Sequence, residues 1–347
     1  MNRTKGYAAL AKDKPLEPYE FSRRAIGAQD VGFEIVFSGI CHSDIHQARE
    51  EWGPSIFPMV PGHEIVGRVT EIGTAVKKFK VGDLIGVGVF VDSCGNCDNC
   101  NRGMEHFCRE GMTGTYNSLE RDGKTIAFGG YSNLFVIKER YAVSIPSNLN
   151  LAGVAPLLCA GITLYSPIRH WKVNKGSRVG IIGLGGLGHM GVKFAAKLGA
   201  EVTVFSHSQG KNEDAFNFGA KQFIYTNTGD WHKPLRKKFD LILNTVSAEI
   251  DLDPYLQCLD TDGTLVIIGL PGKPYAVHAG SLLDGRRSIA GSMIGGMPEL
   301  QEMMDFCGEN QITSEVEVIN ANYINEAYGR TIASDVRYRF VIDASTF

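Results

Sequence analysis

A chain of 347 residues is longer than one hydrophobic core usually organises, and its 44% of hydrophobic residues allow two such cores. The formal net charge of -3, from 35 basic and 38 acidic residues, argues against nucleic acids or anionic membranes as partners. The N-terminus lacks an apolar signal segment, and no later apolar run is long enough and poor enough in glycine to cross a bilayer, so we expect a soluble, cytoplasmic protein.

Up to about residue 145 the chain shows short strand-like runs, such as "FEIVFSGI" and "IVGRVTEIG", broken by Gly, Pro and Asp. Helical periodicity is weak there, so this part is predicted to form a β-rich, barrel-like domain. Inside it, "GICHSDIH" places one cysteine, two histidines and an aspartate within six residues, from Cys41 to His46.

A cysteine quartet follows in "CGNCDNCNRGMEHFC", with two, two and seven residues between successive thiols. The four residues are Cys94, Cys97, Cys100 and Cys108. Eight cysteines in the whole chain are too few for a disulfide scaffold, and this clustering favours thiolates held by a metal in a reducing compartment. Four thiolates complete a closed tetrahedral zinc site with a structural role. An iron–sulfur cluster or four unrelated buried thiols are the alternatives.

From Ser177 the pattern changes to six apolar runs separated by helical stretches: "RVGIIG", "EVTVF", "QFIY", "DLILNTV", "TLVIIGL" and "SIAGSM". Such alternation predicts a doubly wound, parallel α/β sheet. The tail after Gly296 has too little core to stand alone, so we expect it to return to the first domain. The predicted domains are residues 1–153 with 296–347, and residues 154–295.

The run "VGIIGLGGLGHMG" combines a strand, glycines in GxGxxG spacing and a following helix, which is the context of a dinucleotide-binding turn. One glycine allows the tight turn, the next lets the backbone approach a pyrophosphate, and the third lets helix pack on strand. Free amides at the helix start would face the phosphates. A purely structural turn is the alternative. The predicted cofactor-binding residues here are Gly183, Gly185, Gly186, Leu187 and Gly188.

The end of the next strand distinguishes NAD from NADP, because NAD-binding folds usually carry an acidic residue there for the ribose 2'-hydroxyl. Here the strand ends in "VFSHSQGK", which contains no acidic residue. Hydroxyls and a lysine can donate hydrogen bonds to a 2'-phosphate and neutralise it, so NADP(H) is predicted. The predicted contacts are Ser206, His207, Ser208 and Lys211.

A second possible metal set is spread along the chain: Cys41, His63 and Glu64 of "PGHE", and Cys159 of "PLLCAG". One imidazole and two thiolates, with a fourth position open, form the catalytic zinc site of alcohol dehydrogenases. Taken singly, each of these residues could be an ordinary core side chain. Their combination with a dinucleotide-binding fold favours the catalytic interpretation.

In chain order, "GICHSDIH", "PGHEIVG", "GDLIGVG", the cysteine quartet, "APLLCAGIT", "GLGGLGHMG" and "RYRFVID" resemble the zinc-dependent medium-chain alcohol dehydrogenases, and among them the cinnamyl alcohol dehydrogenase type. The resemblance spans nearly the whole chain. It implies a GroES-like catalytic domain, a Rossmann domain, a homodimer and two zinc ions per chain. It also implies that Glu64 is a zinc ligand that exchanges with water.

The same resemblance implies roles for the residues that follow Cys41. Asp44 would hydrogen-bond the zinc-bound imidazole of His63. Ser43 would exchange a proton with the substrate oxygen, and His46 would pass that proton toward solvent. His42 would lie near the cofactor pyrophosphate.

The implied activity is hydride transfer between NADP(H) and primary alcohols or aldehydes, mainly aldehyde reduction. Four residues are predicted for the pocket wall: Phe90, Trp52, Tyr116 and Ile294. A mostly apolar wall suits aromatic substrates, such as cinnamyl or benzyl compounds, and medium aliphatic ones. The alternatives are an NAD-dependent alcohol dehydrogenase and a non-catalytic zinc- and NADP(H)-binding redox sensor. A zinc-ribbon nucleic-acid binder would need a basic face that this composition does not suggest.

Overall fold

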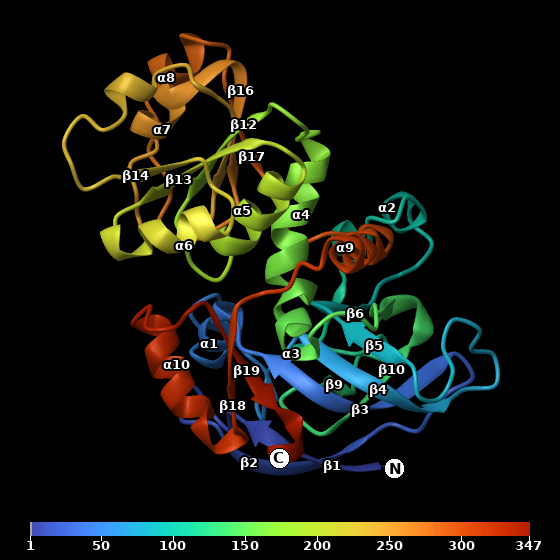
Figure 1. The fold of residues 1–347 in the computed structure, drawn as a ribbon. Helices are drawn as coiled ribbons and strands as arrows, with labels where there is room; N and C mark the ends of the chain where they lie inside the picture. The colour runs from blue at the N-terminus through green and yellow to red at the C-terminus, as the bar shows by residue number, and fades with distance from the viewer. Residues whose placement is uncertain (1) are drawn as a thin grey trace. The chain divides into compact units, whose positions relative to one another are not determined.

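The computed structural model describes residues 2–347, which fold into two compact units (Figure 1). One unit comprises the described residues up to Ile162 together with Gly295–Phe347, and the other comprises Thr163–Ile294. The chain is therefore divided inside helix α4 (Ala160–His170), beyond the predicted boundary at residue 153. Packing explains the position, because Gly161 at the start of α4 lies against Leu157 and Met303 of the first unit.

The first unit is built on a seven-stranded sheet in the order β11-β5-β4-β3-β19-β18, with β10 paired to β3. Only β18 and β19 pair in parallel, and the other neighbours are antiparallel. The predicted β-rich character of this domain is confirmed. The strands are β3 (Asp30–Gly39), β4 (Ile65–Ile72), β5 (Leu84–Val87), β10 (Leu134–Lys138), β11 (Val143–Ser144), β18 (Val316–Ile319) and β19 (Arg339–Asp343).

Shorter elements surround this sheet. Three two-stranded pairs are β1 (Asn2–Ala8) with β2 (Glu17–Arg23), β6 (Phe90–Asp92) with β7 (Thr113–Gly114), and β8 (Ser118–Leu119) with β9 (Ile126–Ala127). The helices of this unit are α1 (His42–Ala48), α2 (Asp98–Asn101), α3 (Leu151–Val154), α9 (Met297–Asn310) and α10 (Ile324–Ile332). The C-terminal tail returns to this unit as expected, because β19 pairs with β3.

One apolar cluster of the first unit anchors helix α1. Ile45 and Ala48 of α1 are buried against Tyr328 of α10, Phe340 of β19 and the fully buried Tyr131. This packed core fixes the position of α1, and with it the side chains on the opposite face of the helix. The cluster ties residues near position 45 to the C-terminal tail.

The second unit is a six-stranded sheet in the order β14-β13-β12-β15-β16-β17, parallel throughout. The six apolar runs of the sequence correspond to β12 (Arg178–Ile182), β13 (Glu201–Ser206), β14 (Gln222–Tyr225), β15 (Phe239–Asn244), β16 (Leu259–Ile267) and β17 (Ser288–Gly291), which confirms the predicted α/β class. Helices α5 (Gly188–Lys197) and α6 (Asn212–Asn217) lie on one side of the sheet, and α7 (Asp253–Cys258) and α8 (Ala279–Leu283) on the other (Figure 1).

Within the second unit, strand β12 pairs with β13 on one side and with β15 on the other. The strand order therefore reverses beside β12. In open parallel sheets, ligands bind outside the carboxyl ends of the strands at such a switch point. The glycine-rich turn that follows β12 lies at this position.

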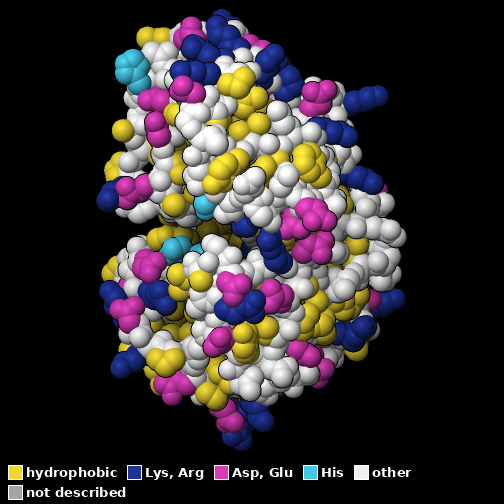
Figure 2. All heavy atoms as spheres, turned by 60° about the vertical axis from the view of Figure 1, so that its left-hand side comes forward, with side chains coloured by type: hydrophobic (Ala, Val, Ile, Leu, Met, Phe, Trp, Pro, Cys, Tyr) yellow, Lys and Arg dark blue, Asp and Glu magenta, His cyan; other side chains and the backbone are white. Residues whose placement is uncertain are grey.

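Among residues 2–347 no single helix is long and apolar enough to cross a membrane; only the pair Leu151–Leu158 and Ala160–His170, bent by 58°, reaches that length and composition together. Most residues of this pair are buried inside the protein. On the surface, Lys and Arg side chains lie among Asp and Glu side chains over most of the face shown in Figure 2. Charges of both signs are thus interspersed there.

Candidate functional site

Four metal-ligating side chains meet in the first unit: Cys41, His63, Glu64 and Cys159. One ligand atom from each lies within 4.8 Å of the others, and all four residues are buried. Cys41 precedes α1, the His63–Glu64 pair precedes β4, and Cys159 lies just before α4. The structure therefore brings together the four residues of the second metal set.

Two atoms of this cluster are buried without a hydrogen-bond partner among the described residues: His63 Nε2 and Glu64 Oε2. Leaving a buried polar group unpaired costs about 1 to 3 kcal/mol, and more when the group is charged. A cation would accept the lone pairs of both atoms. Two thiolates, an imidazole and a carboxylate oxygen are ligands that zinc prefers, so these residues fit a zinc ion.

The pKa values of the two cysteines in the cluster also favour a bound metal ion. The neighbouring Cys159 thiol, followed by His63, holds the pKa of Cys41 well below its ordinary value, against the effect of burial. Conversely, contact with Cys41 and burial raise the pKa of Cys159 well above its ordinary value. Cys41 therefore ionises readily, and its negative charge disfavours ionisation of Cys159. Both sulfur atoms can be ionised together only if positive charge is added nearby. A divalent ion between the two sulfur atoms would provide it.

Asp44 organises the cluster from outside it. Its fully buried carboxylate accepts hydrogen bonds from the backbone amides of Cys41 (2.9 Å) and Gly62 (3.1 Å) and from the Tyr131 hydroxyl (3.0 Å). The fourth contact is His63 Nδ1, at 3.2 Å. Burial disfavours a charged imidazole, but Asp44 holds the pKa of His63 well above its ordinary value. Because Nδ1 donates to Asp44, Nε2 is the nitrogen left to face the cluster.

Arg339, on β19, holds the other end of the site. Its Nη2 donates to Glu64 Oε1 at 2.5 Å and to the Ile40 carbonyl at 2.9 Å. Burial raises the pKa of Glu64 to about 7, although Arg339 acts against this shift. A Cβ atom at position 39 would lie 2.0 Å from Glu64 Oε2, so Gly39 leaves the space that this carboxylate occupies. One carboxylate oxygen is thus bound by arginine while the other remains available to a metal.

The side chains predicted for proton transfer lie on α1, beside the cluster. The Cys41 sulfur atom and Ser43 Oγ are 3.6 Å apart. His46 lies in the last turn of the helix, and its ring centroid is 6.1 Å from that of His42. Residues four apart on a helix share a face, which explains this proximity. The structure places these residues together, and their roles stay predictions.

Of the residues predicted for the pocket wall, three belong to the first unit. Tyr116 is buried and its ring stacks on His63, with centroids 5.7 Å apart. Phe90 is also buried, whereas Trp52 is 47% exposed and stacks on His46. Ile294 is the last residue of the second unit. Their contact with substrate stays a prediction.

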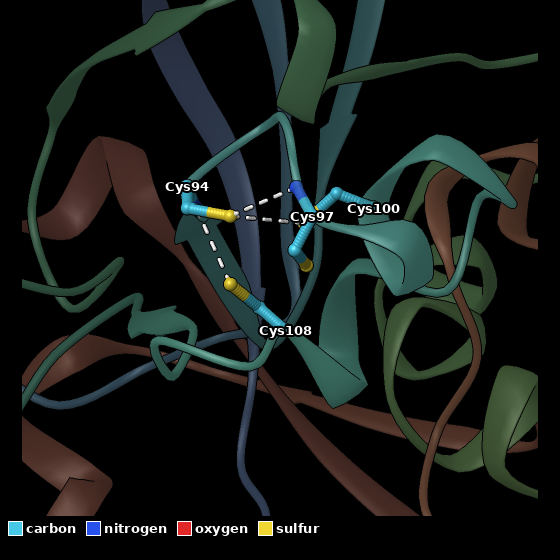
Figure 3. A group of neighbouring side chains, drawn as sticks. All are labelled: Cys94, Cys97, Cys100 and Cys108. Atoms are coloured by element: carbon cyan, nitrogen blue, oxygen red, sulfur yellow. Dashed lines mark hydrogen bonds between the residues drawn. The ribbon is translucent and has the colours of Figure 1, made fainter.

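The cysteine quartet forms a separate cluster within the first unit (Figure 3). One Sγ atom from each cysteine lies within 4.8 Å of the others. The Cys94 and Cys100 sulfur atoms are 3.8 Å apart, and a tetrahedron with zinc–sulfur bonds of about 2.3 Å has edges of about 3.8 Å. The backbone amides of Cys94 and Cys97 donate to the Cys108 and Cys94 sulfur atoms, both at 3.4 Å. The quartet therefore fits a closed zinc site.

In the second unit, the glycine turn has the geometry that the predicted cofactor site requires. Gly183 has a φ of 88°, which disfavours any other residue. No atom lies within 4 Å of the position of a Cβ on Gly185, so the backbone is open to a ligand there. At Gly188 a Cβ would lie 2.0 Å from the Gly183 carbonyl oxygen, so only glycine lets α5 start this close to the turn. Leu187 precedes the first residue of α5.

The loop after β13 lies against this turn. Lys211 Nζ donates to the Leu184 carbonyl at 2.8 Å, which joins the loop to the glycine turn. The Ser208 amide donates to Ser206 Oγ at 3.1 Å, and His207 is exposed. Two hydroxyls and an ammonium group thus lie at the carboxyl end of β13.

Comparison with known proteins agrees with this fold. Residues 27–147 match the alcohol dehydrogenase GroES-like domain, and residues 186–309 match the zinc-binding dehydrogenase domain. NADP-dependent alcohol dehydrogenase C 1 of Mycolicibacterium smegmatis is 54% identical over 347 residues, which are 100% of this chain and 99% of that protein. Aldehyde reductase YahK of Escherichia coli is 49% identical, over 99% of each chain.

Solved structures resemble the chain over nearly its full length. A cinnamyl alcohol dehydrogenase from Sorghum bicolor has a TM-score of 0.96 at 41% identity, over 99% of this chain and 98% of that one. The CAD of Helicobacter pylori in complex with NADP(H) has a TM-score of 0.93 at 42% identity, with the same coverage. The fold and both metal clusters define a zinc-binding dehydrogenase. The chain belongs to the zinc-binding alcohol dehydrogenase family, and the resemblance predicted from its motifs is confirmed.

Sequence reasoning did not find two residues of the site. Arg339 stands in "RYRFVID", directly before the apolar residues of a strand. A basic residue at the start of a buried strand needs a partner for its charge, and this was the available signal. Tyr131, whose hydroxyl binds Asp44, has no such signal, because a tyrosine after "FGG" is common in turns and cores alike.

Proposed function

We propose that this protein transfers a hydride between NADP(H) and primary alcohols or aldehydes, mainly in the direction of aldehyde reduction. The relatives named above include NADP-dependent alcohol dehydrogenases and an aldehyde reductase. The observation that carries the proposal is the buried cluster in which His63 Nε2 and Glu64 Oε2 have no hydrogen-bond partner among residues 2–347. Its two thiols and single imidazole distinguish it from the cysteine quartet, which is closed to substrate.

In this proposal Cys41, His63 and Cys159 would hold the catalytic zinc, with Glu64 as an exchangeable fourth ligand. A zinc ion held there would polarise the substrate oxygen as a Lewis acid. Asp44 keeps the His63 ring in the tautomer that presents Nε2. Arg339, by binding the other oxygen of Glu64, limits how far that carboxylate moves.

The protein's own proton path starts at the Ser43 hydroxyl. During aldehyde reduction Ser43 donates a proton to the substrate oxygen, and His46 restores the proton from the solvent side. In alcohol oxidation the same two groups carry the proton outward. His42 lies on the same face of α1, where it would contact the cofactor pyrophosphate.

The cofactor is NADP(H), bound by the glycine turn and the loop after β13. The amides of Gly185, Gly186 and Leu187 and the start of α5 from Gly188 would face the pyrophosphate. A 2'-phosphate would be held by the hydroxyls of Ser206 and Ser208 and by the ammonium group of Lys211. His207, between the two serines, would also contact it. An acidic side chain, which would repel the phosphate, is absent from this loop.

The proposal is tested by following oxidation of NADPH, and then of NADH, with cinnamaldehyde, benzaldehyde and a medium aliphatic aldehyde, before and after removal of the metal by a chelator. Turnover that favours NADPH and is lost on chelation is expected. Turnover that favours NADH would contradict the cofactor assignment. No turnover by protein that still binds zinc and NADPH would favour the non-catalytic redox sensor instead.

We also propose a cytoplasmic homodimer. All eight cysteines are free thiols, and both metal clusters need unoxidised sulfur, which a reducing compartment maintains. Strand β17 is an edge strand of its sheet, with Ile289 exposed, and Leu283 nearby in sequence is 81% exposed. Open edges of this kind favour pairing with a second copy. Light scattering of the zinc-loaded protein decides the oligomeric state.

A further inference from the structure

His46 has a carboxylate partner that the proton path described above does not use. His46 Nδ1 is hydrogen-bonded to Glu51 Oε2, and the Glu51 backbone amide donates to the His46 carbonyl at 2.9 Å. The chain reaches this arrangement through Glu50, whose φ of 53° is in the left-handed region. A non-glycine residue in that conformation costs on the order of 1 to 3 kcal/mol and persists where the surroundings require it. Here the turn brings Glu51 back over the end of α1.

The adjacent residue fixes the face of the same ring. Trp52 stacks on His46, with ring centroids 4.7 Å apart and an interplanar angle of 26°. Trp52 is 47% exposed, so its indole contributes less to a core than to covering this imidazole. The His46 ring is thereby constrained at one edge by Glu51 and on one face by Trp52.

We propose that Glu51 is a positioning residue for His46 that fixes the tautomer and orientation in which this histidine relays protons. The inference rests on the proposed function, in which His46 carries the proton between Ser43 and solvent. A carboxylate only accepts hydrogen bonds, so the proton of a neutral His46 resides on Nδ1 and the Nε2 lone pair faces away from Glu51. Nε2 is then the atom that takes up and releases the relayed proton. In alcohol oxidation the same Nε2 accepts the proton from the side of Ser43 and passes it to solvent.

A purely structural ion pair is the competing explanation. The side chains of His46 and Glu51 are 22% and 44% exposed, and exposed pairs contribute about 0 to 1 kcal/mol to stability. Substitution of Glu51 should therefore leave the protein folded, which allows its effect on the reaction to be measured. A purely structural pair would change stability but leave kcat and its solvent isotope effect unchanged.

The experiment uses the zinc-loaded protein with benzyl alcohol and NADP+, and compares Glu51→Ala, Glu51→Gln, His46→Ala and the double variant Glu51→Ala/His46→Ala. The matched control is Glu20→Ala, because Glu20 is a carboxylate of similar exposure, 47%, paired with Arg3 on β1. Steady-state kcat and KM are measured for each, together with the solvent isotope effect on kcat.

We expect Glu51→Ala to lower kcat by about tenfold with KM unchanged, in line with the loss of groups that orient a functional histidine. Glu51→Gln keeps an acceptor oxygen and should restore most of kcat. In the His46→Ala background the Glu51 substitution should cause no further loss, because the two residues act as a unit. The Glu20→Ala control should match the unsubstituted protein.

Unchanged kcat in Glu51→Ala would overturn the inference, as would a loss that persists in full when His46 is absent. A change confined to KM would also overturn it. These outcomes leave the proposed function intact, because the unsubstituted protein still turns over. Absence of turnover by the unsubstituted protein would instead overturn the proposed function, and this inference with it.

Discussion

Replacement of Arg339 by methionine tests the electrostatics of the catalytic cluster most directly. The guanidinium is 7% exposed and its Glu64 partner is fully buried. Methionine has a similar length but no charge, so Arg339→Met removes the partner of Glu64 Oε1 and the donor to the Ile40 carbonyl. The Glu64 carboxylate then remains buried without its counter-charge.

The cost follows from this burial. Removing one partner of a buried ion pair destabilises a protein by about 3 to 5 kcal/mol, because the remaining charge stays desolvated. For a folding unit of this size each 1 kcal/mol lowers Tm by about 2 to 4 °C, so the expected drop is roughly 6 to 20 °C. A second substitution, Glu64→Gln, should recover much of the loss in the Arg339→Met background, since no buried charge is then left unpaired.

Calorimetry without added zinc measures these Tm values, at a pH above 7 so that Glu64 of the unsubstituted protein is ionised. Arg286→Met is the control, because Arg286 also pairs with one carboxylate, that of Asp262, but is 81% exposed; it should not change Tm measurably. If Arg339→Met shifts Tm no more than Arg286→Met does, Glu64 is not held as a buried anion by Arg339. Arg339 would then not be the group that leaves Glu64 Oε2 available to a metal.

Other substitutions separate the remaining parts of the protein. Cys159→Ala should abolish turnover while the fold is retained by circular dichroism, whereas Cys100→Ala should lower Tm and release one zinc by metal analysis; unchanged turnover in Cys159→Ala would refute the catalytic assignment. Tyr131→Phe removes one hydrogen bond to the buried Asp44 carboxylate and should cost about 1.5 to 3 kcal/mol in denaturant unfolding, and a smaller change would show that another donor takes its place. Lys211→Ala should lower kcat/KM for NADPH by about 10- to 100-fold, with little change for NADH. An equal loss for both cofactors would place Lys211 outside the 2'-phosphate site.

Patterns confined to short segments could be predicted reliably. The spacing of Cys94, Cys97, Cys100 and Cys108 brings four sulfur atoms together within one loop, since a short chain has few ways to separate them. The glycine turn and its flanking strand and helix form a similarly local unit, and the alternation of six apolar runs was enough to predict the parallel sheet. Helix α1 was not predicted, because its seven residues are too few to show helical periodicity.

The sequence alone determined which residues have metal-binding and cofactor-binding chemistry, because residue type and local spacing are properties of the chain itself. Only the tertiary structure decided which distant residues complete the site. Arg339 lies 275 positions from Glu64 and reaches it because β19 pairs with β3, next to the strand that follows Glu64. The four contacts of Asp44 likewise join segments up to 87 positions apart. Such contacts depend on strand pairing and core packing. They join residues that are far apart in the chain, so no local sequence pattern predicts them.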